Sequence, residues 1–63
     1  MTKIIWLDQD GEDIAETSSS LLPTEGQFVE YDNTGDKYYV DKILHSLSSC
    51  EHFVTVSLVK IVP

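Results

Sequence analysis

The run of residues 52–62, HFVTVSLVKIV, is the feature that most constrains the fold of this chain. Val54, Val56 and Leu58 alternate with polar or less apolar residues, which is the pattern of a strand with one buried face. From Val59 onward the apolar residues fall on the opposite side. Such a change of phase implies a bulge or a bend in the strand. The pattern therefore predicts a long strand in a strongly curved sheet.

Two β-hairpins are predicted earlier in the chain. Each joins two β-prone runs through a turn rich in Asp, Asn and Gly, at residues 8–11 and 32–35, and these residue types favour tight turns. The strands are expected over residues 3–7, 12–16, 27–31 and 37–40. Between the hairpins, residues 17–26 are polar and contain a proline, so we expect a loop held by Leu21 and Leu22.

Residues 41–48 admit two interpretations. Asp41 could cap a short helix that places Ile43, Leu44 and Leu47 on one face. The same residues also suit a continuing strand, which we favour because such a helix would have barely two turns. The expected fold is mainly β: a small, strongly curved five-stranded antiparallel sheet or a partly open, SH3-like barrel, with a possible short helix near 41–48. Residues 1–63 form a single domain.

The length of the chain limits how much core it can build. A chain of 63 residues buries only about 60% of the surface that its unfolded form exposes. Its lone cysteine, Cys50, excludes an internal disulfide, so a partner chain is the expected supplement and a homodimer is favoured. A single thiol suits a reducing compartment, and the apolar run at residues 4–7 is too short for a signal sequence. We expect a cytoplasmic protein.

Charge is distributed very unevenly along the sequence. Residues 1–36 hold nine of the eleven carboxylates and one lysine, giving −8, whereas residues 37–63 hold two carboxylates and three lysines, giving +1. The chain has no arginine. Binding to nucleic acid or to an anionic membrane needs basic side chains that neutralise phosphate, so neither is expected. The balance favours a protein partner with a basic surface.

Metal-binding and catalytic patterns are weak. Asp8, Asp10 and Glu12 have the alternation of a calcium loop, but the required glycine and the final glutamate are missing. His45, Cys50 and His52 lack the paired spacings of structural zinc, and no nucleophile and base are recognisable. We expect no metal, no cofactor and no enzymatic activity.

The candidate binding residues are carboxylates that could steer a partner and aromatic residues that could anchor it. Tyr38 and Tyr39 point to opposite faces of a strand, so one of them is expected outside. The predicted binding residues are Trp6, Asp8, Asp10, Glu12, Asp13, Glu30, Asp32 and Tyr38.

Three segments resemble a pattern found among small, uncharacterised β proteins of bacteriophages and mobile elements. They are Leu22-Pro23-x-x-Gly26-x-x-Val29-x-Tyr31, Tyr39-Val40-x-x-Ile43-x-His45 and Val54-x-Val56-x-Leu58. Members of that group that are understood tend to be inhibitors of host defence or of host enzymes, often acidic and often dimeric. The resemblance implies a viral protein acting in the host cytoplasm.

The expected function is therefore a non-enzymatic, acidic protein-interaction module. In the viral context it would be a phage-encoded inhibitor of a host defence protein, acting by binding or by nucleic-acid mimicry. Two alternatives stay open. One is a small assembly protein that oligomerises through its edge strands, and the other is a ligand-sequestering module built between subunits.

Overall fold

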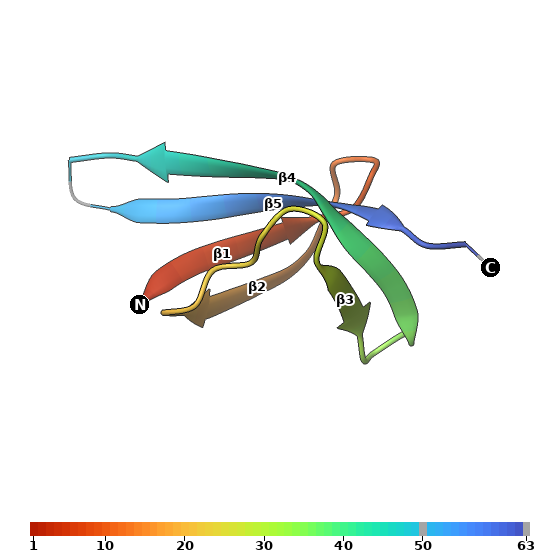
Figure 1. The fold of residues 1–63 in the computed structure, drawn as a ribbon. Helices are drawn as coiled ribbons and strands as arrows, with labels where there is room; N and C mark the ends of the chain where they lie inside the picture. The colour runs from red at the N-terminus through yellow and green to blue at the C-terminus, as the bar shows by residue number, and fades with distance from the viewer. Residues whose placement is uncertain (50, 63) are drawn as a thin grey trace.

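The computed structural model describes residues 1–49 and 51–62, and within them the chain is entirely β (Figure 1). The five strands are β1 (Thr2–Leu7), β2 (Asp13–Ser19), β3 (Phe28–Tyr31), β4 (Asp36–Leu47) and β5 (His52–Lys60). They form one sheet that curls into a half-barrel. The expectation of a small curved β-sheet or partly open barrel is confirmed. No helix long and apolar enough to cross a membrane occurs in the described residues.

The strands lie in the order β2-β1-β5-β4-β3. Three of the four ladders are antiparallel, but β1 pairs with β5 in parallel, from Lys3 opposite Phe53 to Leu7 opposite Ser57. The sheet is therefore mixed and not wholly antiparallel as expected. Turn residues in a sequence predict pairing only between strands that are neighbours along the chain. Because β1 and β5 are the first and last strands, no turn predicts their parallel pairing. The order leaves β2 and β3 as the two edges of the half-barrel.

β4 continues through residues 41–47 as a strand, which excludes the helical alternative. Its register with β5 shifts at Asp41, because Val40 lies opposite Leu58 while Lys42 lies opposite Ser57. This extra residue is a β-bulge, and it lets both Val40 and Ile43 face the concave side. The bulge accounts for the change of apolar phase between Val40 and Ile43 in the sequence, while the residues of β5 pair with β4 without an insertion.

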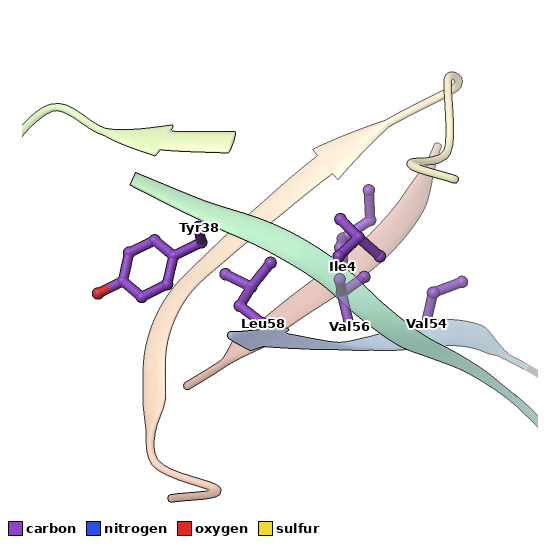
Figure 2. Packing of buried hydrophobic residues seen from close by; sticks show 6 residues of the cluster. Ile4, Tyr38, Val54, Val56 and Leu58 are labelled. Carbon is purple, nitrogen blue, oxygen red and sulfur yellow. The ribbon is translucent and has the colours of Figure 1, made fainter. Parts of the chain in front are cut away.

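The core lies on the concave side of the sheet. Its buried residues are Ile4, Tyr38, Val40, Val54, Val56 and Leu58. Figure 2 shows the three β5 side chains in a row, with Ile4 beside Val56 and the Tyr38 ring at the Leu58 end. This row is the alternating pattern that the sequence predicts for β5.

The first hairpin is longer than expected. β2 reaches Ser19, because β1 offers backbone partners as far as Thr2 opposite Ser19. The remaining loop is not held by leucine side chains as predicted, since Leu21 is 83% exposed and Leu22 is 38% exposed. Backbone hydrogen bonds hold it at its far end, where Gly26 N donates to Val40 O at 2.8 Å and Val40 N donates to Gln27 O at 2.9 Å.

Candidate functional site

A groove of about 320 Å³ crosses the concave face from edge strand β2 to edge strand β3. All five strands contribute to it. Its lining residues are Trp6, Ile14, Ala15, Thr17, Val29, Glu30, Tyr31, Asp32, Tyr38 and Leu58. The lining is mainly apolar and aromatic, and the acidic residues among those that border it are Glu30 and Asp32. We call this feature the concave groove.

Local hydrogen bonds orient two aromatic walls of the concave groove. Trp6 Nε1 donates to Thr17 Oγ1 at 2.9 Å across the β1–β2 pair, and Asn33 Nδ2 donates to Tyr31 Oη at 3.0 Å. Such bonds reduce the number of ring orientations, so part of the ordering cost of binding is met before a ligand arrives.

Tyr38 has a different position from the one predicted. The sequence places one of Tyr38 and Tyr39 outside and offers Tyr38 as the binding residue, but the Tyr38 side chain is only 7% exposed and belongs to the core. It faces inward because it lies opposite Val29 of β3, on the concave side. Tyr38 therefore forms part of the wall of the concave groove. Its neighbour Tyr39 lies opposite Val59 and faces the convex side.

Asp32 lies at the rim of the concave groove, directly after β3. Glu30 also borders the groove, but it alternates with Val29 and Tyr31, which face the core, so its side chain leaves the strand on the convex side, opposite Lys37. Both carboxylates are exposed. The ion pairs of the described residues join Lys3 to Glu16 at 3.1 Å and Lys60 to Asp36 at 3.4 Å, so neither Glu30 nor Asp32 forms an ion pair within the described part of the chain.

The four other predicted carboxylates belong to the β1–β2 turn. Asp8 shapes that turn, because its Oδ1 accepts from Asp10 N at 2.9 Å and from Glu12 N at 3.0 Å. Gly11 follows with a φ of +83°, a conformation that glycine adopts without strain. The calcium-like spacing is thus an ordinary turn. Asp10, Glu12 and Asp13 are exposed and contribute negative charge to it.

Both acidic turns lie at the same end of the sheet. The β1–β2 turn follows Leu7, which pairs with Ser57 near the end of β5, and the β3–β4 turn precedes Tyr38, which pairs with Lys60. Figure 1 shows them on either side of the C-terminal end of β5. The predicted carboxylates therefore share one end of the molecule, although only Glu30 and Asp32 line the concave groove.

Several groove residues were not selected from the sequence. Val29, Tyr31 and Leu58 carry a detectable signal, since they alternate with polar neighbours in predicted strands. Ile14 carries none. It reaches the groove at a register shift in the β1–β2 ladder, where Trp6 pairs with Ala15 and Leu7 with Asp13.

The opposite end of the sheet holds a histidine pair. His45 Nδ1 and His52 Nε2 lie 3.0 Å apart, and the rings are inclined by 15°. No group of three or more His, Cys, Asp or Glu side chains suited to a metal occurs in residues 1–49 and 51–62. Cys50, considered with these histidines as a zinc ligand, lies outside the described residues.

A second hollow, of about 530 Å³, is larger than the concave groove. It is formed by the β3–β4 turn and the C-terminal segment, and it contains the Lys60–Asp36 ion pair and no aromatic ring. The concave groove is the stronger candidate, because aromatic walls with a few polar groups are typical of binding sites.

Comparison of the chain with protein-family models, with curated proteins and with solved structures finds no match.

Proposed function

We propose that this chain is a non-enzymatic protein-interaction module that binds a basic partner at the acidic end of its sheet. The observation that carries the proposal is the concave groove, whose lining includes Trp6 and Tyr38, with Asp32 at its rim and Glu30 on the adjoining strand β3. In the viral context that the resemblance implies, the partner is a host protein and binding inhibits it.

The aromatic and acidic side chains at this end of the sheet support both the binding of a partner and its basic character. Aromatic side chains in concave, water-excluding positions supply most of the affinity in many interfaces. Carboxylates around them raise the rate of association with a basic surface more than the final affinity. The acidic β1–β2 turn lies at the same end of the sheet and enlarges the negative field that a partner meets.

Affinity capture with matched variants tests the proposal. The wild-type protein, the double variant Glu30→Gln/Asp32→Asn and the single variant Glu51→Gln are used as baits in a bacterial lysate. Glu51 lies between β4 and β5, at the other end of the sheet, so its variant is the control for charge alone.

We expect one basic protein to be enriched by the wild type and by Glu51→Gln, and less of it at high salt. The double variant should recover several-fold less. The proposal fails if all three baits recover the same proteins in equal amounts, or if no protein is enriched.

A further inference from the structure

We infer that the concave groove receives an arginine side chain of the partner. This inference rests on the proposed function and adds the chemical identity of the group that is bound. It follows from three properties of the groove: apolar walls, aromatic rings and a rim carboxylate, Asp32, without a cationic partner in the described residues.

The apolar walls suit the stem of a long basic side chain. Ile14, Val29 and Leu58 line the groove, and arginine and lysine bury their methylene stems along such surface while the charged head stays at its edge. A purely apolar ligand would leave the rim carboxylate of Asp32 without a partner and would gain nothing from its charge.

The aromatic walls suit a cation. Trp6, Tyr31 and Tyr38 line the same groove, and within residues 1–49 and 51–62 the ring contact found is the one between His45 and His52. The three groove rings therefore do not stack on one another. A cation within about 6 Å of such a ring is attracted by its electron-rich face, and the attraction is strongest for tryptophan.

The rim supplies the opposite charge. Asp32 is exposed and lines the groove, and the described lysines that form ion pairs use other carboxylates. Arginine fits better than lysine, because a planar guanidinium can stack on an aromatic ring and donate two parallel hydrogen bonds to a carboxylate. The small volume of about 320 Å³ lies at the lower end for ligand sites and suits a side chain better than a folded element.

The test is an NMR titration of the ¹⁵N-labelled full chain with the peptide acetyl-Gly-Arg-Gly-amide. Two matched peptides carry citrulline, which is the neutral analogue of arginine, or lysine. We expect the arginine peptide to bind with a dissociation constant on the order of 1 mM, and to shift the signals of the Trp6 indole and of Tyr31 and Asp32. The citrulline peptide should bind about fivefold more weakly, and the lysine peptide should also be weaker.

Protein variants locate the site. Asp32→Asn should weaken binding of the arginine peptide by a few-fold, because one exposed charge pair contributes little more, while Glu51→Gln should leave it unchanged. Trp6→Leu, which keeps an apolar side chain but removes the indole, should abolish the difference between the arginine and citrulline peptides. The spectrum of each variant without peptide verifies its fold.

Equal binding of the citrulline peptide, tighter binding of the lysine peptide, or shifts confined to the His45 end would each overturn the inference. Its failure is distinguishable from failure of the proposed function. If the lysate yields a partner that depends on Glu30 and Asp32 while the arginine peptide does not bind, only the identity of the bound group is wrong. If the peptide binds and no partner is captured, the proposed function fails.

Discussion

At the scale of single residues, side chains that look equivalent in the sequence differ in burial in the structure. Tyr38 and Tyr39 are adjacent, and alternation places them on opposite faces. Which one is buried depends on the partner strands, because Tyr38 lies opposite Val29 and Tyr39 opposite Phe28. Phe28 is 75% exposed. The local sequence does not specify which of the two tyrosines is buried. For this reason the choice of Tyr38 as the exposed anchor is wrong.

Two valines provide a matched test of the core. Val56 is fully buried and Val62 is 78% exposed. Val56→Ala should lower the free energy of unfolding by about 2 kcal/mol, since it removes packed methyl groups and leaves a cavity. Val62→Ala should change it by less than about 0.5 kcal/mol. Urea denaturation measures both, and equal shifts for the two variants would contradict the assigned core.

Gly35 tests the geometry of the β3–β4 turn. Its φ is +76°, and an added Cβ would meet no atom within 4 Å, so any cost comes from backbone conformation. Gly35→Ala should destabilise the protein by about 1 kcal/mol, and Gly35→Asn by less, because asparagine tolerates this region better. Thermal or urea unfolding measures the change in stability of both variants. A more stable Ala variant would be inconsistent with this turn.

At the scale of elements, the two hairpins and their turns were predictable because their signals are local. Residues 8–11 and 32–35 contain the turn chemistry, and the strands beside them alternate. The parallel pairing of β1 with β5 and the bulge that turns Ile14 into the groove depend on contacts between distant segments. Neither has a sequence signal, so the groove could not be assembled from the sequence although four of its residues were selected.

The bulge in β4 has a direct test. Deleting Asp41 would shift residues 42–47 by one position and exchange their faces, turning Ile43 away from Val56. We expect the deletion to abolish the folded state, whereas Asp41→Asn, at an exposed position, should be tolerated within about 0.5 kcal/mol. Circular dichroism and NMR spectra report both outcomes. A well-folded deletion variant with unchanged stability would refute the register.

At the scale of the whole molecule, a thin core and open edges shape how the chain behaves. Six of the described residues are buried, and both β2 and β3 are edge strands. The convex face adds exposed apolar side chains such as Leu44, which is 63% exposed and lies opposite Thr55. Edges and apolar surface of this kind favour association, and the homodimer expected from the sequence stays a prediction.

Light scattering coupled to size-exclusion chromatography measures the oligomeric state of the protein. The account predicts a mass of twice 7.1 kDa at micromolar concentration. A mass of one chain at every concentration would contradict the dimer, and a broad distribution of large particles would favour the assembly alternative.

The central claim is that partners bind at the acidic end of the sheet, in and around the concave groove. The most direct test is a ¹H–¹⁵N spectrum of the labelled protein with its captured partner added. The account predicts the largest changes at the Trp6 indole, Thr17 and residues 29–32, with little change at His45 and Leu47. Changes concentrated on the β4–β5 hairpin end, with the Trp6 indole unaffected, would contradict it.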